Sequence, residues 1–167
     1  MEQRAFSEFY EASRDACLRA VLASVADRGL AEDLVAEAYA RAWASWPTVR
    51  RHPAPRAWIV RTALNTGVSW WRRQRKEVLV ASSAEHADTF RHPAADATEV
   101  DPALLRMLCM LPRRQREVIA LRVFLDLDTR ETARVLGIAE GTVTAHLARA
   151  IATLRAELVP QAQEVSP

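Results

Sequence analysis

Apolar residues recur at the three- and four-residue spacing of an α-helix along most of this chain. One such stripe runs from Phe6 to Val25, and a second runs from Leu34 to Trp46. The strict apolar–polar alternation of a half-buried strand is absent, and only four residues are glycine. Because each helical stripe must be buried against another apolar surface, the sequence predicts an all-α fold.

Glycine and proline divide these stripes into candidate helices. Gly29 is expected to end the first helix, and Pro47 stops the second because proline lacks the N–H that a helix interior requires. The stretch 77–101 has no sustained periodicity and is rich in small, polar and acidic residues. We therefore expect two small helical domains, at 1–76 and 102–159. A flexible acidic linker at 77–101 joins them, and a disordered tail follows at 160–167.

Charge is unevenly distributed along the chain. Residues 50–76 contain seven arginines and Lys76 but no acid, which gives this block a net charge of +8, whereas the whole chain carries +2. The following block, 77–101, carries −5. A cationic block of this kind attracts phosphate, and arginine offers a planar fork to phosphate and base edges.

The cationic block coincides with a long candidate helix that begins at Pro55 and runs to about Lys76. Placing its residues at about 100° intervals separates two faces. The apolar face holds Ile59, Val60, Ala63, Leu64, Val68, Trp70 and Trp71. The polar face holds Trp58, Arg61, Thr62, Asn65, Ser69, Arg72, Arg73 and Lys76.

This division also separates the roles of the tryptophans. Trp70 and Trp71 lie on the apolar face, which favours packing over a direct role in stacking on bases. Trp58 shares the polar face with the basic residues and is the better candidate for stacking on a nucleic-acid base.

The stretch DTRETARVLGIAEGTVTAHLARAIATLR, residues 128–155, is typical of a helix-turn-helix. Asp128 or Thr129 can cap the first helix, and Gly137 allows a tight turn with positive φ. The second helix is expected to start near Glu140 and to bury Val143, Leu147, Ala150, Ile151, Leu154 and Leu158. The candidate DNA-reading residues are Arg130, Thr142, Thr144, Ala145, His146 and Arg149.

Other interpretations of these residues stay open at this point. Helix pairs joined by a glycine turn also occur in ordinary bundles, and His146 is more often a surface residue than a specific reader. The arginines at 113, 114 and 116 are either a solvated cluster or phosphate contacts.

Several classes of function are disfavoured by composition. No apolar run approaches the roughly 20 residues of a membrane span, and the N-terminus lacks the pattern of a secretion signal. Cys17 and Cys109 are far apart without metal-ligand spacing, and no phosphate-binding glycine loop or catalytic constellation is present. We expect a cytoplasmic protein that is not inserted in a membrane, needs no metal or cofactor, and is not an enzyme.

Two sets of residues resemble a known family. AEDLVAEAYARAW (31–43) and PRAWIVRTALNTGVSWWRRQRK (55–76) resemble region 2 of bacterial RNA polymerase sigma factors. The stretch 111–155, beginning LPRRQREVIALRVFLDLDTRETARVLG, resembles region 4 of the same family. The order, linker and length are similar to the extracytoplasmic-function (ECF) class, and within it to the SigE-like subfamily.

The resemblance implies partners for the first domain. Its second helix would dock on the clamp helices of the largest subunit of the polymerase core, with Asp33, Glu37 and Arg41 on the solvent side and Leu34, Tyr39 and Trp43 shared with the core of the domain. The following helix would bind the −10 promoter element and capture flipped bases, and Asn65 matches a family asparagine in that region. The implied −10 residues are Trp58, Arg61, Asn65, Ser69, Arg72, Arg73 and Lys76.

The resemblance implies further partners for the second domain. Thr144, Ala145 and Arg149 match positions that read the −35 element, and region 4 also touches the flap of the second polymerase subunit. The acidic linker would thread toward the RNA exit path, and family members often have an anti-sigma factor. Many relatives carry Lys or Arg where Thr144 stands, so we expect weaker or differently specified −35 binding.

A DNA-binding regulator with an N-terminal dimerisation module is the main alternative. It would bind duplex DNA strongly by itself, whereas a sigma factor binds free DNA weakly and forms a stable complex with core polymerase. The tryptophan pair of housekeeping sigma factors lies earlier in its helix, so Trp70 and Trp71 are not its equivalents.

Overall fold

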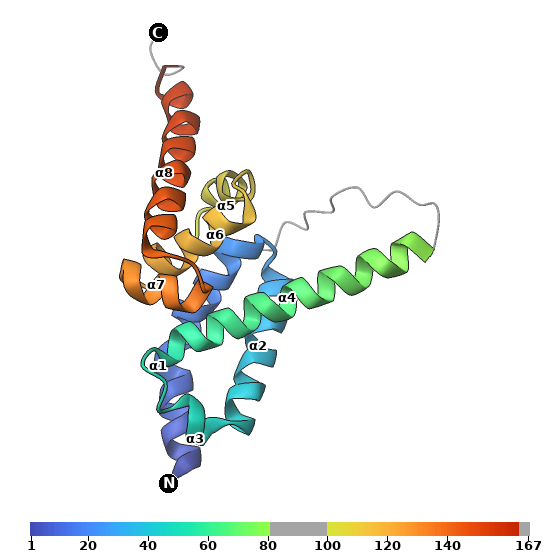
Figure 1. Ribbon diagram of the computed structural model, residues 1–167. Helices are drawn as coiled ribbons and strands as arrows, with labels where there is room; N and C mark the ends of the chain where they lie inside the picture. Colours follow the sequence, from blue (N-terminus) through green and yellow to red (C-terminus); the bar gives the residue numbers. More distant parts are fainter. Residues whose placement is uncertain (81–99, 164–167) are drawn as a thin grey trace.

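The computed structural model describes residues 1–80 and 100–163, and no strand occurs in these ranges (Figure 1). This confirms the all-α prediction. The helices are α1 (Glu2–Val25), α2 (Arg28–Ala44), α3 (Trp46–Val49), α4 (Pro55–Val80), α5 (Pro102–Cys109), α6 (Arg113–Ile119), α7 (Thr129–Leu136) and α8 (Glu140–Gln163), with a π-helical turn, η1 (Ala120–Phe124), between α6 and α7. We call α1–α4 the first helical group and α5–α8 the second.

The first helical group is built on mutual contacts among α1, α2 and α4. Its buried residues include Val21 of α1, Leu34 of α2 and Ile59 of α4, which are the periodic apolar positions of the sequence. Aromatic rings seal the end near the N-terminus, where the ring centroids of Phe6 and Trp46 lie 5.2 Å apart in an edge-to-face arrangement.

The turn between α1 and α2 differs from the prediction that Gly29 ends the first helix. Ala26 ends it instead, in the left-handed conformation at φ 57°, and donates its N–H to the carbonyl of Leu22 at 2.7 Å. Asp27 then caps α2 by accepting the N–H of Leu30 at 2.8 Å. The aspartate cap decides the start of α2, so Gly29 falls within its first turn.

Helix α4 is the longest element and extends away from the other helices in Figure 1. It continues to Val80, four residues into the stretch that the sequence pattern assigns to the linker. Its side chains are described only to Ser69. The predicted positions of Trp70, Trp71, Arg72, Arg73 and Lys76 on the two helix faces therefore lie outside the described side chains.

The second helical group has two small buried clusters of its own. One gathers Val118, Ala133 and Val143 from α6, α7 and α8. The other gathers Leu108, Leu111, Ile119 and Ala150, and it also includes Ala23 from α1. This second cluster therefore contains residues from both helical groups.

The two helical groups share a larger core as well. Ala120, Leu121, Leu125, Leu127 and Val135 of the second group belong to the same buried cluster as the core residues of α1, α2 and α4. The contacts join α1 to α5, α6 and η1, and α4 to α7. The sequence pattern predicts two groups but does not predict that they pack against each other.

Candidate nucleic-acid interface

The two predicted faces of α4 are separated in the structure as far as Ser69. Ile59, Val60 and Ala63 are fully buried against α1 and α2, whereas Arg61, Asn65 and Ser69 are exposed. Trp58 and Thr62 are half-buried at the margin between the faces. The helical periodicity therefore correctly assigned each of these side chains to the core or to the surface.

A hollow of about 460 Å³ lies beside the exposed face of α4. It is lined by Trp58, Thr62 and Asn65 of α4 and by Arg41, Ala44 and Ser45 at the end of α2. The chain reverses between these elements through α3 and the proline-containing loop that follows it, which brings the end of α2 against the start of α4 (Figure 1). The sequence analysis missed Ala44 and Ser45; Pro47, which stops the preceding helix, was the available signal.

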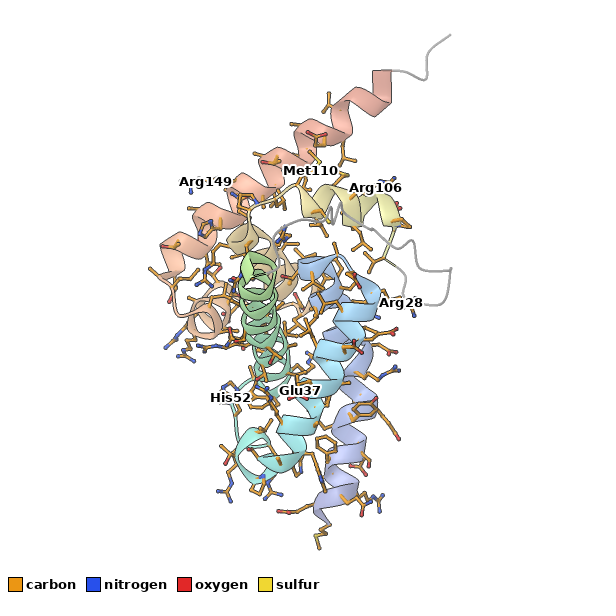
Figure 2. The ribbon with its side chains drawn as sticks, turned by 90° about the vertical axis from the view of Figure 1, so that its right-hand side faces the viewer. Arg28, Glu37, His52, Arg106, Met110 and Arg149 are labelled. Atoms are coloured by element: carbon orange, nitrogen blue, oxygen red, sulfur yellow. The ribbon has the colours of Figure 1, made fainter. Side chains whose placement is uncertain are left out.

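Arg41 connects the hollow to the outer surface of α2. Its Nε atom donates to Oε1 of Glu37 at 2.8 Å, and both side chains are about half exposed. Figure 2 labels Glu37 on α2 beside α4. The side chain predicted to contact polymerase thus also lines the hollow next to the predicted −10 residues.

The predicted polymerase-binding residues of α2 fall into two sets. Asp33, Glu37, Arg41 and Trp43 are exposed, and Trp43 has 48% of its surface accessible despite a ring contact with Phe6. Leu34 and Tyr39 are buried in the core of the first helical group. These two residues support α2 from inside, because they present too little surface to reach a partner.

Tyr39 and Cys17 form part of a sealed polar cluster in that core. The hydroxyls of Tyr39 and Ser13 are hydrogen bonded at 2.7 Å, and Cys17 donates to the carbonyl of Arg56 at 3.8 Å. Burial raises the pKa of the Cys17 thiol to about 11 and raises the pKa of the Tyr39 hydroxyl above its ordinary value. Both groups are therefore neutral and structural at physiological pH.

Helices α7 and α8 form the predicted helix-turn-helix. Asp128 accepts the N–H of Glu131 at 2.7 Å, and the Glu131 carboxylate accepts the N–H of Asp128 at 3.0 Å, which makes a reciprocal capping box. Gly137 ends α7 at φ 65°, and its N–H bonds to the carbonyl of Ala133. No atom lies within 4 Å of a Cβ added at Gly137, so the backbone angle alone requires glycine there.

The predicted DNA-reading residues lie mostly on the surface. Arg130, Thr142, Thr144 and Arg149 are exposed, and Ala145 is half-buried. Figure 2 shows Arg149 on the outer side of α8. His146 is half-buried, and its Nδ1 atom is shielded from solvent with no hydrogen-bond partner. His146 is therefore poorly placed to offer that nitrogen to a base.

The predicted buried stripe of α8 is wrong at its far end. Val143 and Ala150 are buried, but Ile151 is 37% exposed and Leu158 is 55% exposed. Ile151 lies between the buried Ala150 and the partly buried Leu154, so it marks the edge of the covered face, whereas Leu158 lies near the end of α8, which extends beyond the second group in Figure 1. Periodicity assigns these residues to an apolar face without revealing whether the face is covered.

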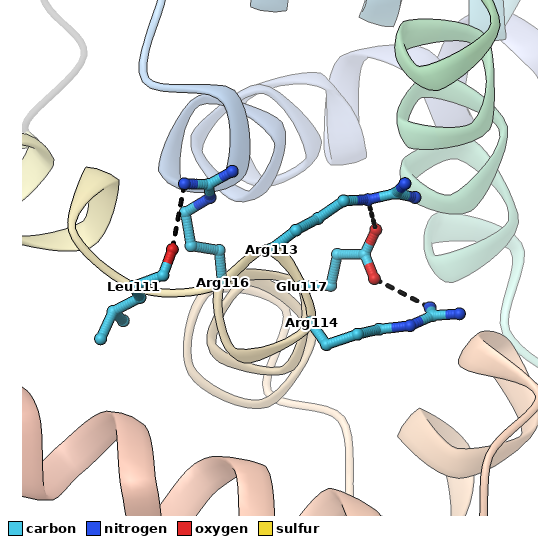
Figure 3. Close-up of polar contacts among 5 residues, drawn as sticks. All are labelled: Leu111, Arg113, Arg114, Arg116 and Glu117. Atoms are coloured by element: carbon cyan, nitrogen blue, oxygen red, sulfur yellow. Dashed lines mark hydrogen bonds and ion pairs between the residues drawn. The ribbon is translucent and has the colours of Figure 1, made fainter. Parts of the chain in front are cut away.

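The arginines of α6 have partners within the protein that the sequence analysis did not predict. Arg113 Nε and Arg114 Nη1 hold the two carboxylate oxygens of Glu117 at 2.8 and 2.9 Å (Figure 3). Arg116 instead donates to the carbonyls of Cys109 and Leu111. The sequence analysis missed Glu117, although a carboxylate three and four residues after two arginines is the spacing of a helical ion pair.

Among the described residues, no group of three or more His, Cys, Asp or Glu side chains is placed to hold a metal ion. None of the helices in the described ranges combines the length and hydropathy needed to cross a bilayer.

Comparison with known proteins identifies the class to which this fold and these surfaces belong. Residues 9–77 match the family described as Sigma-70 region 2, and residues 102–154 match Sigma-70, region 4. The chain is 37% identical over 157 residues to the RNA polymerase sigma-E factor of Streptomyces coelicolor, covering 92% of this chain and 86% of the relative. It is 31% identical to the ECF RNA polymerase sigma factor BldN of the same organism, covering 95% of this chain and 62% of the relative.

The chain therefore belongs to the RNA polymerase sigma factors of the ECF class. It is an initiation factor that acts in promoter-directed transcription. The solved structure of the sigma factor RpoE in complex with the anti-sigma factor NepR from Bartonella quintana is similar in fold, with a TM-score of 0.80. That comparison covers 93% of this chain and 97% of RpoE at 24% identity.

Proposed function

We propose that this protein binds RNA polymerase core, reads a −10 element with α4 and a −35 element with α8, and helps to open the promoter. The observation that carries this proposal is the hollow beside Asn65, together with the exposed polar face of α4 that borders it. The proposed domains remain those of the sequence analysis, with −10 binding in the first and −35 binding in the second.

The hollow supports capture of an unpaired base. Its volume of about 460 Å³ falls within the range of roughly 300–1,000 Å³ of small-molecule pockets. The Asn65 amide can both donate and accept hydrogen bonds to a base edge, and the Trp58 ring offers an apolar surface for stacking. Arg41 on the opposite wall can attract the adjoining phosphate.

Base capture of this kind can drive strand separation without hydrolysis. Each base-pair step that is melted costs about 1.4 kcal/mol of stacking. Each captured base that stacks on an aromatic ring contributes about 1–3 kcal/mol of binding free energy, which offsets that cost. Arg72, Arg73 and Lys76 continue the predicted basic face and would add phosphate attraction that weakens with salt.

The exposed side of α8 supports duplex reading in the major groove. Arg149 can bind guanine through two hydrogen bonds, and the Thr142, Thr144 and Ala145 methyl groups can contact thymine. Arg130, which is exposed at the start of α7, would contact a backbone phosphate. Two modest sites on one chain give specific binding together, because the first contact raises the effective concentration of the second.

Polymerase binding is assigned to the exposed flank of α2. Trp43 is the strongest candidate there, because exposed tryptophans commonly become binding hot spots when a partner buries them. Asp33, Glu37 and Arg41 supply a charged rim. The exposed apolar residues Met110, Ile151 and Leu158 of the second group are assigned to the polymerase flap.

An anti-sigma factor is a further proposed partner. The similar RpoE structure contains one, and the similar structure of CnrH, at a TM-score of 0.67, is a complex with the cytosolic domain of CnrY. Since transcription takes place there, we assign the protein to the bacterial cytoplasm.

Run-off transcription tests the function. Core polymerase is incubated with genomic promoter fragments with and without this protein, and promoter-dependent products are expected only when it is present. A chain that binds duplex DNA tightly by itself but does not associate with purified core polymerase would instead be a regulator of the alternative class.

A further inference from the structure

We propose that a crevice between α4 and α6 is a binding site for a small tetrahedral oxyanion, with inorganic phosphate as the ligand. The guanidinium groups of Arg61, Arg113 and Arg114 hold the anion. The inference goes beyond promoter reading, because side chains of this chain alone define the site. Binding there requires neither DNA nor polymerase.

The crevice is small and has charged walls. It has a volume of about 140 Å³. Its polar lining consists of Arg61 and Asn65 from α4 and Arg113, Arg114 and Glu117 from α6, and the rest of its wall is apolar and comes from α4, η1 and α7. Apolar walls strengthen the field of the charged groups that they surround.

Size restricts what can enter this crevice. At about 30 Å³ for each water molecule, its volume corresponds to a few waters, which is enough for one tetrahedral oxyanion. The volume is below the roughly 300 Å³ at which pockets for whole small molecules begin. A nucleotide is therefore excluded, whereas the hollow of about 460 Å³ beside Trp58 can take a base. Arg61 lines the crevice but not that hollow.

Charge makes the crevice suitable for an anion. Three guanidinium groups and one carboxylate give its lining a net charge of +2. Glu117 is 3% exposed and is shared between Arg113 and Arg114 (Figure 3). Arg61 forms no ion pair within the part of the chain that the structure describes. One carboxylate thus serves three cations, and an oxyanion with two negative charges would neutralise the remainder.

The N–H groups that remain are the donors that an oxyanion needs. A guanidinium has five N–H donors, and its planar fork matches the oxygens of phosphate. In the bonds to Glu117, Arg113 uses its Nε atom and Arg114 uses its Nη1 atom. The Asn65 amide supplies a further N–H donor. Because Glu117 already fixes both arginines of α6, less conformational entropy is lost when the anion binds.

Occupancy of the site has a consequence for the free protein. An anion held by Arg61 on one side and by Arg113 and Arg114 on the other connects α4 to α6. A ligand that binds only the folded chain raises its stability, and the increase depends on the free ligand concentration. The denaturation temperature of this protein is therefore expected to rise with phosphate concentration at constant ionic strength.

Titration calorimetry of the full-length chain with inorganic phosphate tests the proposal. Sodium chloride keeps the ionic strength constant, and we expect saturable binding with a dissociation constant on the order of 0.1–1 mM. Arg61→Gln is expected to weaken binding roughly tenfold, since it removes charged hydrogen bonds to the anion. Arg51→Gln is the matched control, because Arg51 is exposed, lies outside the crevice and is not among the predicted −10 residues.

The control is expected to bind phosphate as the wild type does. Circular dichroism without phosphate checks that both variants fold, which is expected because Arg61 and Arg51 are exposed. The rise in denaturation temperature with phosphate is expected in the wild type and in Arg51→Gln, and is expected to be lost in Arg61→Gln.

Other anions identify the chemistry that the site recognises. Sulfate is expected to compete with phosphate, because it has the same shape and carries two negative charges. Chloride is expected not to compete. Adenosine monophosphate is expected to bind more weakly than inorganic phosphate, since its nucleoside does not fit the crevice.

Three results would overturn the inference. The first is the absence of saturable phosphate binding by the wild type. The second is an equal loss of binding in Arg61→Gln and Arg51→Gln, because it would show attraction to the cationic block as a whole. The third is tighter binding of adenosine monophosphate than of phosphate, because it would place the anion in an open site.

Run-off transcription keeps this inference separate from the proposed function. A chain that supports transcription but binds no phosphate loses only the oxyanion site. A chain that binds phosphate in the crevice but supports no transcription retains that site and loses the proposed function.

Discussion

The two helical groups are stabilised in different ways. The first buries long apolar stripes of α1, α2 and α4 against each other and adds an aromatic seal from Phe6, Phe9 and Trp46. The second has only small clusters of its own and contributes four larger apolar residues, Leu121, Leu125, Leu127 and Val135, to the core of the first. The first group can fold on its own contacts, whereas the second gains much of its burial from a neighbour.

This difference extends to the way in which the second group keeps its fold. Its small internal clusters are supplemented by short-range devices, such as the Asp128–Glu131 capping box and the turn at Gly137. Its larger apolar residues are buried against the first helical group.

The largest expected effect is a loss of stability in the first core. Ile59 is fully buried, whereas Ile151 on α8 is substantially exposed. Ile59→Ala is expected to lower the free energy of unfolding by about 2–5 kcal/mol, since it removes apolar burial and leaves a cavity. Ile151→Ala is the matched control, with an expected change within about 0.5 kcal/mol.

Urea denaturation followed by circular dichroism measures both values. A comparable loss for both variants would mean that Ile151 is covered in solution, as Ile59 is.

Alkaline pH offers a second test of the first core. Burial raises the pKa of Cys17 from 9.0 to about 11, so the folded chain keeps a proton that the unfolded chain releases between these values. Stability is therefore expected to fall as pH rises from 9 to 11, by on the order of 2 kcal/mol from this thiol. The Tyr39 hydroxyl acts in the same direction at higher pH.

Denaturation midpoints at pH 8 and pH 10.5 measure the fall, and Cys17→Ala is the control because it lacks the titrating group. If the variant loses as much stability as the wild type, Cys17 is not the source.

Each helical group has a glutamate that pairs with an arginine four residues away, and the two glutamates differ in burial. Glu117 is buried and holds Arg113 and Arg114, whereas Glu37 pairs with Arg41 at the surface. Glu117→Gln is expected to cost about 1–2 kcal/mol, because hydrogen bonds to charged groups are stronger but the arginines are half exposed and screened. Glu37→Gln is expected to cost about 0–1 kcal/mol.

Thermal denaturation at low and high salt distinguishes these cases. The Glu117 effect is expected to persist at high salt better than the Glu37 effect, since buried pairs are screened less. Equal salt sensitivity would argue that Glu117 is exposed to solvent in solution.

The sequence predicts the local features of both groups well. Helical periodicity assigned Ile59, Val60, Arg61 and Asn65 to the correct faces, because burial along one helix follows from its own repeat. The cap and turn residues correctly predicted the ends of α7 in the helix-turn-helix, because caps and turns also depend on neighbouring residues in the sequence. The resemblance to sigma factors, carried by motifs in both groups, is confirmed by the matches to region 2 and region 4.

The errors arise where burial depends on a distant element. Ile151 and Leu158 fit an apolar stripe, yet both are exposed, although Leu154 between them is partly buried against the second group. The packing of Leu121 and Leu125 against the first group cannot be inferred from their own helix, since an apolar side chain does not specify its partner. Trp43 is a further case, because it is expected to be shared with the core together with Leu34 and Tyr39, yet only Leu34 and Tyr39 are buried.

The smallest expected effect tests the open side of the α4 face. Asn65→Ala removes an amide that borders the hollow but is exposed, so the fold should be unchanged. Loss of one hydrogen bond to a base is expected to weaken one −10 base preference by about 0.5–1.5 kcal/mol, or roughly two- to tenfold. Core polymerase binding is expected to be unchanged, because the proposed docking flank is on α2.

Transcription from a promoter library randomised at the −10 element measures that preference, and Thr66→Ala serves as the control on the same helix. Thr66 is not among the predicted −10 residues, and its hydroxyl is already bonded to the Thr62 backbone carbonyl at 2.8 Å. If wild-type protein and Asn65→Ala transcribe every −10 variant equally, the hollow does not read DNA. If the substitution instead weakens polymerase binding, the docking flank extends from α2 across Arg41 to α4, and the two proposed surfaces are one.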